Sequence, residues 1–239
     1  MSPSPVSSPL KGEETVWKDD FVMEGQTEVI AVIDYGAGNL RSVVNAITRL
    51  GYEPKITSDP DEVLSAQAVI LPGVGAAPDA MSMLTKSRLD ATIRRLIKED
   101  RPLLGVCLGL QLLLTGTEEG GWHECLGIIP GRVRKLPLQG KGLKIPHMGW
   151  NQVKQKKSHP IFEGVPDEAN FYFVHSYHAD PEDKSFVAGE TEYGIPFCSV
   201  LVRGNLVATQ FHPEKSGDIG LRIYDNFIKL AIRVGASRN

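Results

Sequence analysis

The chain has 239 residues, of which 41% are hydrophobic, and its 26 basic and 29 acidic side chains leave a formal charge of −3. No segment approaches the roughly 18 consecutive apolar residues that a membrane-spanning helix needs, which argues against a membrane protein. The near-neutral charge argues against a nucleic-acid-binding protein, because such proteins carry a clear excess of basic residues.

Residues 1–28 differ in composition from the rest of the chain. They begin with prolines and serines and continue with more acidic than basic residues, for a segment charge of −4. The segment lacks the features of a secretory signal and is too acidic for a transit peptide. We therefore expect residues 1–28 to be a disordered N-terminal extension and residues 29–239 to form one domain.

From residue 29 onward, apolar runs alternate with helical patterns. The patterns predict strands at residues 29–34, 53–58, 68–71 and 102–107, and helices at residues 40–50 and 89–97. Strands that alternate with helices predict a parallel sheet with helices on both faces. Such sheets place their active sites at the carboxyl ends of the strands.

The second half of the chain is richer in strands. The patterns predict strands at residues 126–136, 144–154, 170–179, 197–203 and 206–211, a hairpin at Gly204–Asn205, and a final helix from residue 216. The predicted fold class is α/β: an open, mostly parallel sheet flanked by helices, with an antiparallel extension.

The three cysteines suggest a reducing, intracellular compartment. Cys107, Cys125 and Cys198 are odd in number and contain no CxxC pair, which fits neither a disulfide framework nor a zinc site. We expect no metal and no cofactor. Cys125 and Cys198 match no motif and are interpreted as structural.

Cys107 lies in the segment GVCLGLQ, residues 105–111, between a predicted buried strand and the start of a helix. This pattern is typical of a nucleophile elbow, in which a sharp turn exposes the nucleophile in front of a helix N-terminus. The helix start favours a thiolate, and the N–H of Leu108 would point toward an oxyanion. A buried core cysteine is the alternative.

Two further segments complete a possible catalytic constellation. In QFHPEKS, residues 210–216, His212 and Glu214 are two apart and would face the same side of an extended chain, so Glu214 can orient the imidazole. In LPGVG, Gly73 and Gly75 flank Val74 and allow a backbone N–H to turn toward a bound carbonyl. A surface histidine and a plain turn are the alternatives for these segments taken singly.

In this order, LPGVG, GVCLGLQ and HPE resemble the class I, triad-type glutamine amidotransferases. DYGAGNLRSV (34–43), IPHMGWN (145–151), FYFVHSYHA (171–179) and QFHPEKSG (210–217) are similar to the glutaminase subunits of imidazole glycerol phosphate synthases, from histidine biosynthesis. The likeness covers roughly residues 29–232. It implies a flavodoxin-like amidotransferase fold.

The resemblance implies hydrolysis of L-glutamine to glutamate and ammonia. Cys107 would form a γ-glutamyl thioester, with His212 as base and then acid and Glu214 as its orienting group. The oxyanion hole would combine the N–H of Leu108 with one from Gly73, Val74 or Gly75. A mobile Val74 peptide would then suffice as an on–off switch.

The same resemblance assigns residues that bind glutamine. Gln111 would lie one helical turn beyond the nucleophile, and Glu119 would meet the substrate ammonium, with a solvated surface charge as its alternative. His175, Ser176 and Tyr177 would contact the amino-acid end, largely through backbone groups. His178 is expected outside the pocket.

The implied partner is a (β/α)₈-barrel cyclase subunit that receives the ammonia in a cytoplasmic heterodimer. The candidates for the docking face are Asn39, Met148, Trp150, Asn151 and Lys215. Trp150 is the best anchor by residue type, because aromatic residues dominate binding hot spots. A core tryptophan is its alternative.

Three other functions compete with this interpretation. The chain could be a glutaminase that serves another synthase, which the HMGWN and DYGAGN segments oppose. It could be a non-catalytic binding module, which the intact triad opposes. It could be a peptidase or another hydrolase with the same triad, which the pairing of Gln111 with Glu119 opposes.

Overall fold

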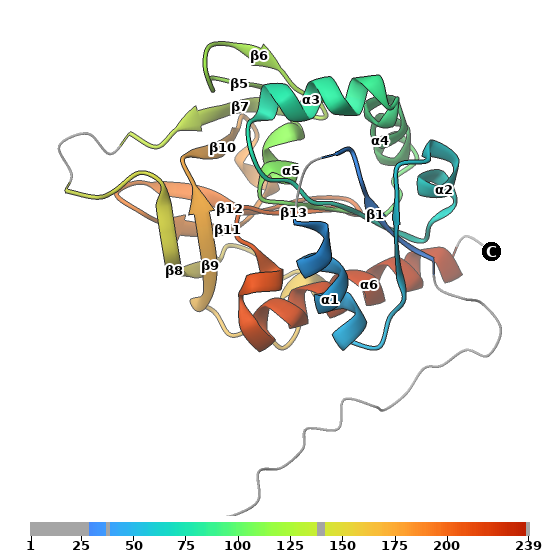
Figure 1. Ribbon diagram of the computed structural model, residues 1–239. Coiled ribbons are helices and arrows are strands. Elements are labelled where there is room, and N and C mark those ends of the chain that lie inside the picture. Colours follow the sequence, from blue (N-terminus) through green and yellow to red (C-terminus); the bar gives the residue numbers. More distant parts are fainter. Residues whose placement is uncertain (1–28, 37–38, 138–141, 238–239) are drawn as a thin grey trace, which may run out of the picture.

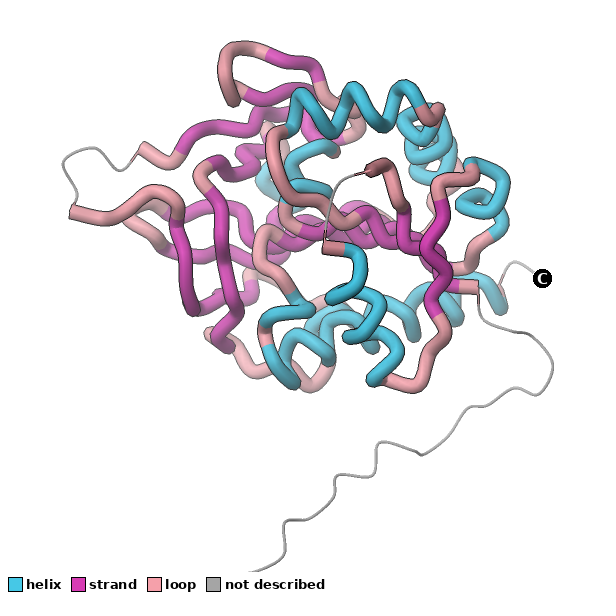
Figure 2. The backbone as a smooth tube through the Cα atoms, viewed as in Figure 1, coloured by secondary structure: helices cyan, strands magenta, loops and turns pink. Residues whose placement is uncertain are grey.

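The computed structural model describes residues 29–36, 39–137 and 142–237. One large sheet runs through the middle of the molecule, and helices cover both of its faces (Figures 1 and 2). The expected N-terminal extension, residues 1–28, lies outside the described residues and stays a prediction.

Five parallel strands form the centre of the sheet, in the order β2-β1-β3-β4-β13. Their bounds are β1 Ile30–Ile33, β2 Pro54–Thr57, β3 Ala68–Leu71, β4 Leu103–Val106 and β13 Leu206–Thr209. Alternate residues enter opposite cores: Ile30 and Val32 pack on one face, and Ala31 and Ile33 on the other. This double burial explains why β1, β3, β4 and β13 are short, almost uninterrupted apolar runs, whereas the edge strand β2 is largely exposed.

Two layers of helices cover the sheet. Helices α1 (Leu40–Arg49) and α6 (Gly217–Ala236) lie on one face, and α2 (Pro60–Ser65), α3 (Ala77–Lys86), α4 (Leu89–Lys98) and α5 (Leu108–Leu112) lie on the other (Figure 1). Because the chain returns through a helix after each of the first strands, β1, β3 and β4 are parallel neighbours and their carboxyl ends meet at one edge.

Mostly antiparallel strands extend the sheet beyond β13. The sheet continues through β12 (Pro196–Arg203), β10 (Tyr177–Pro181), β7 (Ile129–Lys135), β5 (Leu114–Thr117) and β6 (His123–Glu124). Strand β11 (Val187–Glu192) pairs with β12 and with β8 (His147–Gln155), which pairs with β9 (Ala169–His175). The predicted fold class and its antiparallel extension are confirmed.

Several element boundaries differ from the sequence expectation. The helix that starts after Cys107 is short: it ends at Leu112, and Thr115 already belongs to β5. The single strand expected over residues 170–179 is two strands, because β9 pairs with β8 while β10 pairs with β7 and β12. No helix in the described ranges is long and apolar enough to cross a membrane.

Candidate active site

Cys107 stands at a strained turn between β4 and α5. Its φ of 54° and ψ of −103° lie outside the regions that non-glycine residues ordinarily adopt. The turn is fixed on two sides: the Cys107 N–H donates to Thr209 O at 2.7 Å, and a Cβ at Gly109 would lie 2.0 Å from Leu71 O. The elbow predicted from the sequence is therefore present. Cys107 is buried and directly precedes the first residue of α5.

His212 and Glu214 are brought together beside this turn. His212 Nδ1 lies 2.8 Å from Glu214 Oε1, and both side chains are almost fully buried. The contact was expected from an extended chain, but residues Pro213–Lys215 form a 3-10 turn, and that tighter turn brings the carboxylate back to the ring. The Tyr224 hydroxyl donates to Glu214 Oε2 at 3.3 Å from helix α6.

The second nitrogen of His212 faces the thiol. Nε2 is buried and has no hydrogen-bond partner among the described residues. Burial by itself lowers the pKa of His212, but the neighbouring Cys107 and the Glu214 carboxylate outweigh it and raise the pKa to about 10. His212 can therefore accept a proton from Cys107 and hold it as an imidazolium.

The loop after β3 lies against the elbow. A Cβ at Gly73 would fall 2.8 Å from Leu108 Cβ and 3.2 Å from the Gly109 amide nitrogen, so only glycine allows this approach. Leu108 is the first residue of α5, and its N–H has no acceptor within the helix. Val74 is 41% exposed, and Gly75 has a φ of +92°. The two expected sources of an oxyanion hole thus lie side by side.

Two glutamine side chains join the elbow to β10. Gln111 Nε2 donates to Tyr177 O at 2.8 Å and to Gln210 Oε1 at 3.1 Å, and Gln210 Nε2 lies 3.7 Å from Cys107 Sγ. The sequence reasoning selected Gln111 but missed Gln210, although Gln210 stands two residues before His212. Tyr224 was missed as well, because nothing in the helical pattern of α6 distinguishes it from a core residue.

Glu119 is half-buried after β5. Its Oε2 accepts a hydrogen bond from the Ala77 N–H at 2.8 Å, at the first residue of α3. A carboxylate at a helix N-terminus is stabilised by the unpaired N–H groups there. This contact excludes the alternative of a merely solvated charge and gives Glu119 a structural role, beside which a role in substrate binding stays a prediction.

Two backbone oxygens of the segment expected to meet glutamine already have partners. Ser176 O accepts from the Leu136 N–H, and Tyr177 O accepts from Gln111 and also lies 2.9 Å from His175 Nδ1. His175 is buried and Ser176 and Tyr177 are half-buried. Tyr177 O therefore has both of its lone pairs engaged, whereas Ser176 O has one recorded donor and can accept a second hydrogen bond.

A directed chain of hydrogen bonds links this segment to β8. Because a carbonyl only accepts, His175 Nδ1 donates to Tyr177 O, and its Nε2 accepts from His147 Nδ1 at 2.9 Å. His147 Nε2 then accepts from Asn151 Nδ2 at 3.3 Å. Burial lowers the pKa of His147 to about 4 and that of His175 to about 3, which keeps both rings neutral as the chain requires.

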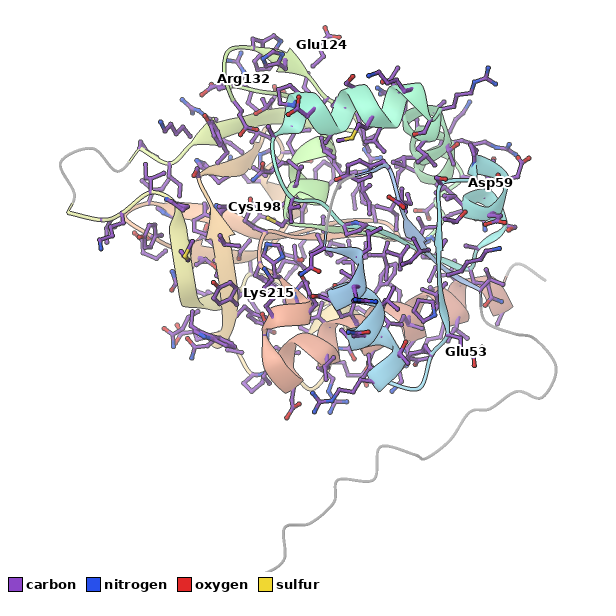
Figure 3. All side chains as sticks on the ribbon, in the orientation of Figure 1. Glu53, Asp59, Glu124, Arg132, Cys198 and Lys215 are labelled. Carbon is purple, nitrogen blue, oxygen red and sulfur yellow. The ribbon has the colours of Figure 1, made fainter. Side chains whose placement is uncertain are left out.

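The docking-face candidates divide into two groups. Met148 and Trp150 are 62% and 58% exposed on one face of β8, so the alternative that Trp150 is a core residue is wrong. Trp150 packs edge-on against Tyr172, and Lys215 Nζ lies 5.9 Å from the centre of the same ring (Figure 3 labels Lys215). Asn151 is instead occupied by His147 and Glu192 O.

Asn39, the remaining candidate, is exposed at the N-cap of α1. Its side chain makes no capping hydrogen bond.

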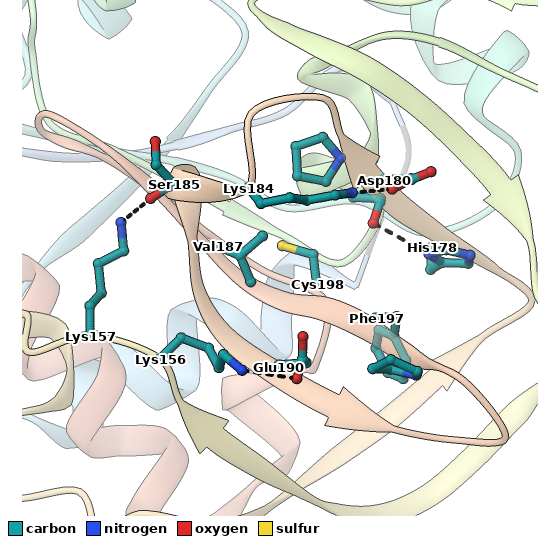
Figure 4. A pocket seen from close by; sticks show the side chains of 13 residues that line it. Lys156, Lys157, His178, Asp180, Lys184, Ser185, Val187, Glu190, Phe197 and Cys198 are labelled. Carbon is teal, nitrogen blue, oxygen red and sulfur yellow. Dashed lines mark hydrogen bonds and ion pairs between the residues drawn. The ribbon is translucent and has the colours of Figure 1, made fainter.

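A hollow of about 630 Å³ lies apart from the triad, between β8, β10, β11 and β12 (Figure 4). His178 lines this hollow, and its expected place outside the glutamine pocket stays a prediction. Two of the lysines that line the hollow have their charges paired: Lys156 with Glu190 at 3.3 Å, and Lys184 with Asp180. Cys198 forms part of the floor, and burial raises its pKa to about 12, so it is an unreactive thiol.

Cys125 is also a buried thiol. Burial raises its pKa to about 11, with the Glu119 carboxylate adding to the effect. Across the described ranges, no group of three or more His, Cys, Asp and Glu side chains is placed to hold a metal ion.

Comparison with known proteins gives consistent matches. Residues 31–230 match the family model for glutamine amidotransferase class-I. The imidazole glycerol phosphate synthase subunit HisH of Dehalococcoides mccartyi (strain CBDB1) is 57% identical over 204 residues, covering 85% of this chain and 98% of the relative. The HisH subunit of Moorella thermoacetica is 50% identical over 206 residues, covering 86% and 97%.

A solved structure shares the fold at much lower identity. PurLQS from Thermotoga maritima superposes with a TM-score of 0.68 at 16% identity, covering 86% of this chain and 99% of that chain. This likeness supports the fold alone.

Proposed function

Because the chain belongs to the class-I glutamine amidotransferases and, within them, to the HisH family of imidazole glycerol phosphate synthase subunits, we propose that it is the glutaminase of that synthase in histidine biosynthesis. The chain is an enzyme that takes ammonia from L-glutamine. The observation that carries the assignment of its site is the buried His212–Glu214 contact of 2.8 Å beside the strained Cys107 turn.

In the proposed reaction, His212 takes the proton of Cys107, and the thiolate attacks the side-chain amide carbon of glutamine. The tetrahedral intermediate collapses to a γ-glutamyl thioester, and the His212 imidazolium gives its proton to the departing ammonia. Water, activated by His212, then releases glutamate. Glu214 stabilises the charged imidazole throughout, as the raised pKa of His212 indicates.

The oxyanion of each tetrahedral intermediate would be held by the N–H of Leu108 and by one from the loop Gly73–Gly75. Removing one such donor costs on the order of 10²–10³ in rate. The exposed Val74 and the positive φ of Gly75 support a loop whose peptide can turn. A peptide that turns its N–H away from Cys107 would keep glutamine hydrolysis low until a partner is bound.

The proposed partner is the (β/α)₈-barrel cyclase, in a cytoplasmic heterodimer. Ammonia is mostly protonated at neutral pH and then is no nucleophile, so direct transfer between subunits has a clear purpose. The exposed Met148 and Trp150 and the nearby Lys215 support a docking face on β8. Gln111, Glu119 and the segment His175–Tyr177 complete the proposed glutamine pocket.

The assignment of the nucleophile is tested by Cys107→Ala. We expect the variant, assembled with the cyclase, to lose glutamine-dependent synthesis by at least about 10³-fold while ammonia-dependent synthesis stays near the wild-type rate. Cys198→Ala is the control and should keep both activities. A Cys107→Ala protein that still released glutamate at the wild-type rate would refute the assignment.

A further inference from the structure

One buried polar atom at the active-site edge has no partner. Tyr35 follows directly after β1, its side chain is 5% exposed, and its hydroxyl makes no hydrogen bond in the described part of the chain. Buried hydroxyls are normally paired, because an unpaired one has lost its bonds to water without replacement. The absence of a partner in this state therefore requires an explanation.

The hydroxyl lies where three strand ends meet. Strands β1, β3 and β4 are neighbours, and they lead into Tyr35, Gly73 and Cys107, respectively. A Cβ at Gly73 would lie 2.6 Å from the Tyr35 hydroxyl and 2.8 Å from Leu108 Cβ. The phenol thus reaches across the end of β3 and sits against the backbone of the oxyanion loop.

The hydroxyl is suited to donate a hydrogen bond. Burial raises the pKa of Tyr35 above its ordinary value, and the negative charge of Cys107 raises it further. Tyr35 therefore keeps its proton at working pH and does not compete with His212 as a base. Among the described residues, the other buried side-chain atoms without partners belong to Gln67, Thr191, Ser199 and His212. The atom nearest to a Cβ at Gly73 is the Tyr35 hydroxyl.

We infer that Tyr35 is a positioning residue of the oxyanion loop, and that its hydroxyl donates a hydrogen bond to the Gly73 carbonyl when the Gly73–Val74 peptide turns the N–H of Val74 toward Cys107. The N–H and C=O of one trans peptide point in opposite directions, so turning the N–H into the site leaves the carbonyl in need of a donor. Tyr35 supplies that donor only in the active state. The inference rests on the proposed function, which it deepens.

The test is Tyr35→Phe, measured as steady-state glutaminase activity of the complex with the cyclase and its nucleotide substrate. We expect kcat to fall about 5- to 10-fold, the size of one neutral hydrogen bond, with KM for glutamine within twofold of wild type. The Tm of the isolated chain should stay equal or rise, because an unpaired buried hydroxyl is removed. Alkylation of Cys107 by iodoacetamide should keep its wild-type rate.

Two results would overturn the inference: an unchanged kcat, whether or not KM rises, or a loss of kcat accompanied by a lowered Tm. Tyr52→Phe is the matched control, because the Tyr52 hydroxyl donates to Asp225 at 3.1 Å, away from the triad, and its kcat should not change. If the wild-type chain is not stimulated by the cyclase at all, the proposed function fails. Stimulation of wild type and variant alike refutes only the role of Tyr35.

Discussion

The Cys107 thiol is held at its site by a backbone conformation that costs about 1–3 kcal/mol. The parallel pairing of β4 with β13 and the close packing of Gly109 on Leu71 offset that cost. The same pairing places Thr209 beside Val106, so that the chain leaving β13 carries His212 to the elbow. The register of β4 against β13 therefore places both the strained nucleophile, Cys107, and the buried His212–Glu214 pair.

After Cys107, the Glu214 carboxylate is the second cause of the raised pKa of His212, and we expect that pKa to set the alkaline limit of activity. Glu214→Gln keeps the shape of the side chain but removes a charge that raises the pKa of His212, so the pKa should fall from about 10. Because His212 must carry a proton to release ammonia, we expect the alkaline limb of kcat/KM to move to lower pH. The pH profile of kcat/KM, measured as glutamate release at about ten pH values from about 6 to about 10.5, checks the shift of this limb.

Tyr224→Phe is the control for Glu214→Gln, because it removes one donor to Glu214 but leaves the carboxylate in place. Its alkaline limb should move less. An unshifted limb in Glu214→Gln would contradict the role given to the carboxylate.

At this scale the sequence predicts what is local. Cys107, His212 and Glu214 were identified because the residues near each of them carry a pattern. Gln210, Tyr224 and Tyr35 were not, because their contacts depend on how the chain after β13, helix α6 and the chain after β1 pack against distant segments. The extended conformation predicted between His212 and Glu214 was also wrong, because Pro213 starts a 3-10 turn and does not extend the strand.

Strands β8 and β9 form a two-stranded unit that joins the main sheet through the pairing of β8 with β11. Its register places His147 opposite His175, and the two rings form the central link of the hydrogen-bond chain from Asn151 to Tyr177. The His147 ring also stacks on Tyr193 with centroids 3.9 Å apart. The sequence suggested one strand over residues 170–179, since nothing local marks the change of partner at Ser176.

This unit should weaken in acid. Burial holds the pKa of His147 near 4 in the folded chain against about 6.5 in the unfolded chain, so the stabilisation is present above pH 6.5 and is lost as the pH falls toward 4. Between pH 7 and pH 5, we expect the unfolding free energy of wild type to fall by about 1–2 kcal/mol more than that of His147→Phe. Urea unfolding at the two pH values measures this.

At pH 7 the His147→Phe variant should be less stable than wild type by about 1–3 kcal/mol, because His175 Nε2 loses its donor. His123→Phe, on the half-exposed β6, is the control for the substitution itself and should keep the wild-type stability at pH 7. An equal acid loss in His147→Phe and wild type would show that His147 does not titrate as described.

On the scale of the whole molecule, the fold leaves two large apolar side chains of β8, Met148 and Trp150, exposed. Met148 and Trp150 project outward beside Tyr172 and Lys215. They alternate along β8 with His147 and Asn151, which belong to the hydrogen-bond chain that ends at Tyr177. Hydropathy patterns could not decide between a core and a surface Trp150. Only the pairing of β8 with β9 fixes which face looks out.

Trp150→Ala should weaken binding of the cyclase by about 2 kcal/mol, or about 30-fold in Kd, while leaving the Tm nearly unchanged. Isothermal titration with the purified cyclase gives the Kd directly. Trp122→Ala is the matched control: Trp122 is 51% exposed and packs against Arg132 instead of joining the β8 face. Equal affinities for Trp150→Ala and wild type would remove Trp150 from the docking face.

The most direct measurement is glutamate release from L-glutamine by the chain alone and by the chain with the cyclase and its nucleotide substrate. We expect very slow release alone and a rise on the order of 10²-fold or more in the complex, the size of one recovered oxyanion donor. Fast hydrolysis by the isolated chain that does not respond to the cyclase would contradict both the partner and the switch in the Gly73–Gly75 loop.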